Sequence, residues 1–125
     1  MNAKDLLSNY RDNTKDILSI AETEKAARKL ADNANERGLD EICQKYQADA
    51  ERRKSRIETL IRDNEKIECM IEKVDDSTSR ELLRRRYIAF QEWEKIAVEM
   101  HYTYKHLVAV LHPKALKLFE RCNTM

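Results

Sequence analysis

The side chains best suited to specific polar contacts follow one another directly after Thr103. They are Tyr104, Lys105 and His106, and Ala109 is expected on the same outward face. Lysine can donate hydrogen bonds to guanine acceptors, and histidine and tyrosine can bond to bases or phosphates. A helix that begins after a capping Thr103 also presents free backbone amides that favour a phosphate. These residues predict contacts to double-stranded DNA, with an ordinary solvated face as the alternative.

Two further groups of basic residues lie on either side of this segment. The run Arg84-Arg85-Arg86 precedes it, and Lys114 and Lys117 follow it. Positively charged side chains of DNA-binding proteins neutralise phosphates independently of base sequence. We therefore expect Arg84, Arg85, Lys114 and Lys117 to contact phosphates, although a solvated face accounts equally well for the arginines.

The polar residues of the chain do not form a pattern typical of catalysis or metal binding. His101, His106 and His112 lack ligand spacing, and no Asp or Glu accompanies them suitably. No nucleophile and base are combined with an oxyanion-binding loop, and a single glycine leaves no loop to cradle phosphates. We expect no enzymatic activity, no cofactor and no metal site.

Two short helices are expected to position the polar residues, over 91–100 and 104–111, with a turn over 101–103. Ala97 is small enough for the place where the helices cross. Apolar residues expected to pack between them are Ile96, Met100, Tyr102, Leu107 and Val110. Thr103 is the expected N-cap, and His101 stands where a left-handed backbone is needed. This is the pattern of a helix-turn-helix.

The segment from Arg86 to Leu116 resembles region 4 of bacterial primary sigma factors. It is still more similar to small phage and prophage proteins of Gram-positive bacteria that join a helical N-terminal stretch to a sigma-like C-terminus. The match is carried by Arg86-Tyr87, Trp93-Glu94, Ile96-Ala97, Met100, Tyr102-Thr103, Leu111-His112 and Ala115-Leu116. The resemblance implies a transcription regulator, similar in some cases to phage late-gene activators, in the cytoplasm of a bacterial host cell.

The sequence around this segment predicts two more helices. Thr78 and Glu81 form a capping-box pattern that predicts a helix over 78–90. Trp93 is expected to pack between helices. Pro113 cannot donate a hydrogen bond to Ala109 and disfavours helix just before itself, so the last helix should kink or restart there.

The first half of the chain predicts a long antiparallel helical hairpin. Apolar residues recur at steps of three and four from Leu6 to Ala34, and again from Cys43 to Val74. Asn33, Asn35 and Gly38 between these stretches predict a helix end and a tight turn. The fold class is therefore all-α, with a coiled-coil hairpin over 1–76 and a helix-turn-helix domain over 77–125 that we expect to fold alone.

The second helix of the hairpin has the cleaner stripe. Its seam residues are Ile57, Leu60, Asn64, Ile67, Ile71 and Val74. A buried Asn in such a seam usually fixes register or strand number. Because two thin helices bury little surface by themselves, we expect these residues to join two chains in a homodimer, with a structural spacer as the plainest function.

Composition agrees with a helical protein outside the membrane. The 125 residues include one Gly and one Pro, and 38% are charged. No apolar run approaches the roughly 20 residues of a membrane span. Cys43, Cys69 and Cys122 form no CxxC pair, which favours a reducing cytosol.

The distribution of charge leaves the function open between two classes. Residues 1–76 hold 15 Lys and Arg against 18 Asp and Glu, a net charge of −3. Residues 77–125 hold 9 against 5, a net charge of +4. DNA should therefore bind the second half. Because +4 is modest, the alternative is a protein-interaction module that binds RNA polymerase or a host factor, and a purely structural coiled coil is a third interpretation.

Overall fold

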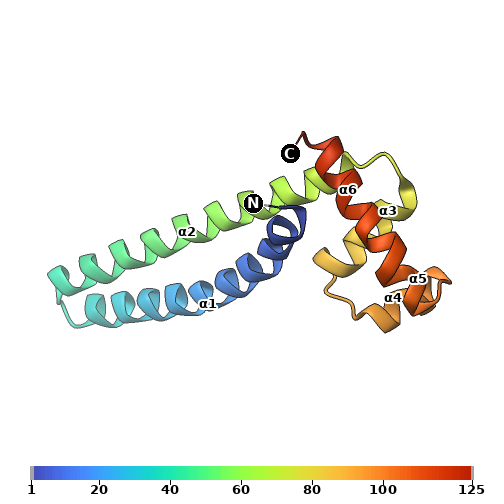
Figure 1. Ribbon diagram of the computed structural model, residues 1–125. Helices are drawn as coiled ribbons and strands as arrows, with labels where there is room; N and C mark the ends of the chain where they lie inside the picture. Colours follow the sequence, from blue (N-terminus) through green and yellow to red (C-terminus); the bar gives the residue numbers. More distant parts are fainter. Residues whose placement is uncertain (1, 125) are drawn as a thin grey trace. The chain divides into compact units, whose positions relative to one another are not determined.

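The computed structural model describes residues 2–124, and all regular structure among them is helical, which confirms the all-α part of the predicted fold class. The segments, labelled in Figure 1 where there is room, are α1 (Ala3–Glu36), α2 (Asp40–Glu72), α3 (Ser77–Leu83), η1 (Arg84–Ile88), α4 (Trp93–Met100), α5 (Tyr104–His106), η2 (Leu107–Leu111) and α6 (His112–Cys122). The η segments are π-helical and continue the helices before them.

The turn between α1 and α2 has the geometry that its glycine predicts. Gly38 has φ +71°, in the left-handed region that a side chain would strain. The amide of Leu39 donates to the carbonyl of Ala34 at 2.9 Å, and the amide of Gly38 donates to Asn35 at 3.1 Å. This pair of bonds is a Schellman motif, which satisfies the last carbonyls of α1 and reverses the chain. The predicted helix end is confirmed.

The described residues pack as two compact units. Residues 13–63 form one, which we call the hairpin unit, and residues 2–12 with 64–124 form the other, which we call the core unit. Helices α1 and α2 contribute to both units. The boundary after residue 76, expected from composition and pattern, thus differs from the division that packing makes.

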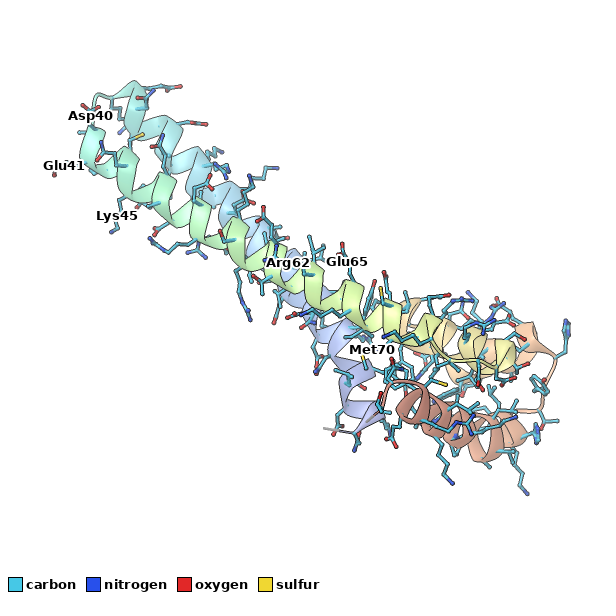
Figure 2. All side chains as sticks on the ribbon, turned by 90° about the horizontal axis from the view of Figure 1, so that it is seen from above. Asp40, Glu41, Lys45, Arg62, Glu65 and Met70 are labelled. Atoms are coloured by element: carbon cyan, nitrogen blue, oxygen red, sulfur yellow. The ribbon has the colours of Figure 1, made fainter. Side chains whose placement is uncertain are left out.

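The hairpin unit is held together mainly by small residues. Figure 1 shows the two helices side by side and antiparallel, and the residues buried between them include Ala27, Ala31, Ala34, Cys43 and Ala50. Small side chains let two helices approach closely. Polar contacts at the rim join Arg28 to Glu51 at 3.3 Å and Arg53 to the hydroxyl of Thr23 at 3.0 Å. Figure 2 shows charged residues such as Lys45 along the exposed side of α2.

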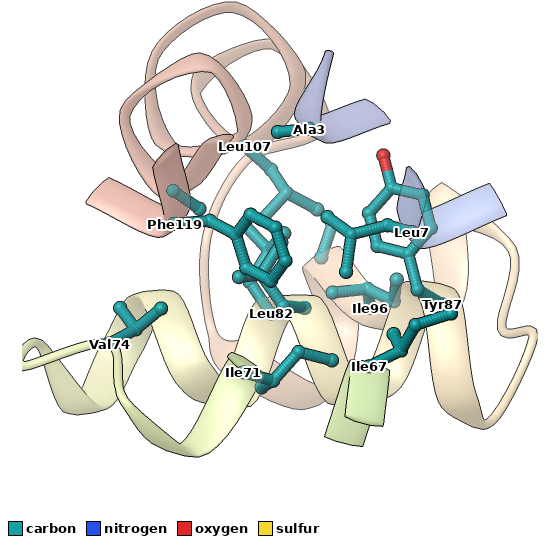
Figure 3. Packing of buried hydrophobic residues seen from close by; sticks show 13 residues of the cluster. Ala3, Leu7, Ile67, Ile71, Val74, Leu82, Tyr87, Ile96, Leu107 and Phe119 are labelled. Carbon is teal, nitrogen blue, oxygen red and sulfur yellow. The ribbon is translucent and has the colours of Figure 1, made fainter. Parts of the chain in front are cut away.

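The core unit contains the large apolar core, shown in Figure 3. Its buried residues are Ala3, Leu7, Ile67, Ile71, Val74, Leu82, Leu83, Tyr87, Ile96, Ala97, Leu107, Ala115 and Phe119. Leu7 and Phe119 are fully buried in it, although they lie more than a hundred positions apart. The large core thus includes residues from the start of α1 and from 67–74 besides those of the C-terminal helices, and this packing argues against the prediction that residues 77–125 fold alone.

Hydrogen bonds hold the start of α1 and the end of α2 in the core unit. The amide of Ala3 donates to the Glu120 carboxylate at 3.2 Å. The Tyr10 hydroxyl donates to Glu68 at 2.7 Å, and burial together with this bond raises the pKa of Tyr10 to about 12. The side chain of Asn123 donates to the carbonyl of Met70 at 2.9 Å. The N-terminal segment is thus a part of the core unit.

The residues expected to join two chains are buried within a single chain. Leu60, Asn64, Ile67, Ile71 and Val74 are all buried, and Ile57 is half-buried. Three of them, Ile67, Ile71 and Val74, belong to the core that Figure 3 shows. An interface between chains cannot use this seam unless the core opens. Periodicity correctly predicted that these residues are buried, and a homodimer through them stays a prediction.

Helix α3 begins one residue earlier than expected and uses a different cap. Asp76 is the N-cap, and its carboxylate accepts hydrogen bonds from the Ser79 amide at 3.1 Å and the Ser79 hydroxyl at 2.6 Å. These bonds lower the pKa of Asp76. The capping box predicted for Thr78 and Glu81 is therefore wrong, because Asp76 caps the helix through the Ser79 amide.

Replacing Asp76 with alanine should lower the free energy of unfolding by about 1 kcal/mol, the usual effect of losing an N-cap. The neighbouring Asp75→Ala is the matched control, since Asp75 is largely exposed and meets Arg121 only at 3.9 Å. Urea unfolding of the two variants measures the difference. Equal stability of the two would contradict the assigned cap.

Candidate nucleic-acid interface

The turn after α4 is closed by a second Schellman motif, built here on a histidine. The amide of Tyr102 donates to Ala97 at 2.9 Å, and the amide of His101 donates to Val98 at 3.3 Å. His101 has φ 62° and ψ 40°, in the left-handed region. Histidine is among the residues that tolerate this conformation. The expectation of a left-handed His101 is confirmed.

Thr103 caps the next helix, as predicted. Its hydroxyl accepts a hydrogen bond from the amide of His106 at 3.1 Å, and its carbonyl accepts one from Leu107 at 3.0 Å. Ile96, Ala97 and Leu107 are buried between the helices, and Met100 is half-buried. The predicted contact of α4 with the following helix is therefore present.

Two residues predicted to be buried in this contact are instead partly exposed. Val110 is 49% exposed, and Tyr102 is 37% exposed. The Tyr102 ring instead lies 5.8 Å from the ring of His106. The π-helical turn of η2 changes the rotation per residue, so Val110 points away from the face that an α-helical spacing predicts.

The face predicted to meet DNA is exposed along the first turn of the helix. Tyr104, Lys105, His106 and Ala109 are all exposed. Within residues 2–124, Lys105 lies in no ion pair, so its ammonium has no carboxylate to displace before it meets another acceptor. The capped amide of His106 fixes the start of the helix behind these side chains.

Pro113 does not end the helix. The backbone stays helical through Leu111 and His112, and the His112 amide donates to the carbonyl of Leu107, five residues back. This wider turn stands just before the proline, which occupies the first turn of α6. A proline is tolerated there because its missing amide is not needed. The expected restart takes the form of a changed hydrogen-bond register.

Lys114 and Lys117 lie together in a shallow groove along η2 and α6. The groove is lined by Ala109, Val110, Pro113, Lys114, Lys117, Leu118 and Arg121. Its three charged side chains are all positive, and no carboxylate lines it. We call this surface the basic groove. Arg121 was missing from the predicted site, although its spacing of four residues from Lys117 on one helix would have revealed it.

Arg84 and Arg85 form ion pairs within the chain, and their contacts to phosphates stay a prediction. Arg84 forms a bidentate ion pair with Glu72, with distances of 2.6 to 2.8 Å. Arg85 bonds to Glu81 at 3.0 Å and to Glu99. Each arginine joins η1 to a neighbouring helix and is neutralised by a carboxylate. A single sequence cannot reveal such partners, because two of the three lie more than ten positions away.

His112 lies in a partly buried aromatic cluster. Its ring centroid lies 4.6 Å from that of Trp93, and the Tyr87 hydroxyl lies 2.7 Å from its Nε2 atom. Trp93 thus packs between helices as predicted. Burial lowers the pKa of His112 to about 4, and the charges of Lys4 and Arg86 add to the effect. The neutral ring can accept the hydrogen bond from Tyr87 at Nε2.

The free energy of unfolding should therefore fall as the pH drops from about 6.5 to about 4. In this window the unfolded chain binds a proton at His112 that the folded chain does not. Because the ring is only half-buried, we expect an effect of about 1–2 kcal/mol. Chemical unfolding across this range should show a smaller pH dependence in His112→Gln than in the exposed control His106→Gln. Identical pH profiles of the two variants would refute the assignment.

No helix of residues 2–124 is long and apolar enough to cross a membrane. The chain was compared with protein-family models, with curated proteins and with solved structures, and none of the three comparisons gave a match.

Proposed function

We propose that the chain is a sequence-specific DNA-binding regulator of transcription, of the phage or prophage type. In this proposal α4 and the helix that begins at Tyr104 act as a helix-turn-helix, and the N-terminal end of the second helix enters the major groove. Lys105 and His106 read base edges, and Tyr104 contacts bases or phosphates.

The proposal rests on an exposed, polar helix start that is capped and anchored in the core. Thr103 caps the helix, and Leu107 anchors it in the core directly behind the exposed residues. Lys105 is exposed without an ion pair in the described chain. The basic groove continues from the same helix and supplies Lys114, Lys117 and Arg121 for phosphates.

Salt-dependent titration of a labelled duplex separates the two kinds of contact. Lys114→Ala and Lys117→Ala should each weaken binding to every sequence and lower the slope of log K against log salt by about 1. Lys66→Ala, which removes an exposed lysine from α2, is the matched control and should leave the slope unchanged. No change of slope in either groove variant would refute phosphate contacts by the basic groove.

An interaction with RNA polymerase or a host factor is the second candidate, and a specific feature favours it. Val98 on α4 is 74% exposed and Val110 is 49% exposed, so apolar side chains stand beside the polar ones. Exposed apolar side chains are more typical of protein contacts than of phosphate contacts. Val98→Ser should weaken a protein complex while it leaves affinity for DNA unchanged.

A homodimer through the hairpin is not part of the proposal. Its predicted residues, Ile67, Ile71 and Val74 among them, are buried in the core of a single chain. A chain that binds DNA as a monomer contacts fewer phosphates than a dimer, so its affinity should be modest and less steeply dependent on salt than that of a dimer.

A further inference from the structure

A second cluster of positive charge lies apart from the basic groove, in a pocket between the start of α1 and the end of η1. The pocket is lined by Leu7, Ser8, Arg11, Asp12, Arg86, Tyr87 and Phe90 and has a volume of about 150 Å³. All of these residues belong to the core unit. Figure 3 shows Leu7 and Tyr87 next to each other in the core. We call it the α1–η1 pocket.

The two arginines of this pocket, Arg11 and Arg86, differ from Arg84 and Arg85. Arg84 and Arg85 are neutralised by carboxylates, whereas neither Arg86 nor Arg11 lies in an ion pair within residues 2–124. Arg86 donates one hydrogen bond, to the carbonyl of Gln91 at 3.1 Å. Since a guanidinium has five N–H donors, most of those on Arg86 remain available.

Both guanidinium groups are held in place by aromatic rings. The Arg86 guanidinium lies 4.5 Å from the Trp93 ring centroid, and that of Arg11 lies 5.6 Å from the Phe90 ring centroid. A stacked guanidinium keeps its edge free for a planar pair of hydrogen bonds to an oxyanion. Less entropy is then lost when a ligand binds.

Phe90 holds its place beside Arg11 at a conformational cost. Its φ of 58° lies in the left-handed region, where a bulky side chain is strained. The ring is fixed by Tyr10, whose centroid lies 6.2 Å away, and by Arg11. Such strain concentrates at ligand-binding sites. The loop geometry agrees with a site that is formed before the ligand arrives.

We propose that the α1–η1 pocket binds a phosphate group between Arg11 and Arg86, with the Ser8 hydroxyl as a further donor. The volume is well below the roughly 300 Å³ at which pockets for drug-sized ligands begin, so the pocket suits a single phosphate and not a whole nucleotide. Asp12 also lines it and opposes an anion, but its one negative charge faces two positive ones. The source of the phosphate is a free ion or the DNA backbone.

Titration of the isotope-labelled full chain with inorganic phosphate at constant ionic strength tests this proposal by NMR. The Nε–H signals of Arg11 and Arg86 should shift and saturate at millimolar phosphate, and sodium chloride should not reproduce the effect. Arg11→Gln should weaken binding at least tenfold and should fold normally, because Arg11 is exposed. Arg37→Gln removes an exposed arginine of the hairpin turn and should bind like the wild type. Asp12→Asn should bind several-fold more tightly.

A second titration with a short duplex identifies the source of the phosphate. If inorganic phosphate shifts both signals, the pocket takes the free ion, and this result stands even where no DNA binds. If only the duplex shifts them, and Arg11→Gln weakens its binding, the ligand is a backbone phosphate. If neither titrant shifts them, if Arg11→Gln binds as tightly as the wild type, or if Asp12→Asn weakens binding, the proposal is overturned.

Discussion

Residues 77–125 prepared as an isolated fragment are expected to be unfolded. Five of the thirteen buried residues of the large core come from outside this range, namely Ala3, Leu7, Ile67, Ile71 and Val74. Without them the buried faces of Leu82, Leu107 and Phe119 would meet water. A domain of about fifty residues has little surplus stability with which to tolerate that loss.

Proton–nitrogen correlation spectra measure this outcome directly. The fragment should give poorly dispersed signals, whereas the full chain should give dispersed signals for the same residues. A fragment of residues 64–125 restores three of the five missing residues and should recover partial helicity. Dispersed signals from 77–125 that superimpose on those of the full chain would contradict the assigned core.

Leu7→Ala should lower the free energy of unfolding by about 2–5 kcal/mol, the second large effect. Leu7 is fully buried among residues of the C-terminal helices, so its loss leaves a cavity in the core unit. Leu18→Ala is a matched control on the same helix, because Leu18 is 65% exposed, and it should cost well under 1 kcal/mol. Urea unfolding of both variants gives the comparison, and similar losses would show that α1 does not enter the core.

The ends of the helices were largely predictable from local chemistry. α1 ends before Gly38 because the turn requires a residue in the left-handed conformation. α5 begins after Thr103 because the Thr103 hydroxyl accepts a hydrogen bond from the free amide of His106. The cap of α3 was misplaced by two residues, since Asp76 and Thr78 both offer an oxygen and spacing alone does not decide between them. Local signals thus locate helix ends well but rank competing caps poorly.

The partners of each buried face were much less predictable. Ile67 and Ile71 on α2, and Val74 just after it, were correctly predicted to be buried, yet periodicity does not say whether the covering residues belong to the same chain. Leu7 was missed for a related reason. It stands beside Leu6 on a helix that was assigned a single apolar face, whereas the start of α1 buries Leu7 fully and leaves Leu6 half-buried.

In the candidate site, too, features set by neighbouring residues were predictable, and features set by contacts between distant residues were not. Exposure of Lys105 and His106 follows from the position of Leu107 on the same helix, so it was predictable. Neutralisation of Arg84 by Glu72 depends on how α2 and η1 meet, so it was not. Tertiary contacts therefore decide which basic side chains are free of a carboxylate partner. Such side chains line the basic groove and the α1–η1 pocket.

Selection from a pool of random duplexes at two salt concentrations tests DNA recognition most directly. Wild-type protein should enrich a defined sequence, and the preference should persist at the higher salt because base contacts release few counterions. Lys105→Ala should cost about 1–3 kcal/mol and relax the preference at one position, and His106→Ala should alter it nearby. If the wild type enriches no sequence, or if both variants keep its affinity and preference, the helix that begins at Tyr104 does not read DNA and the account is contradicted.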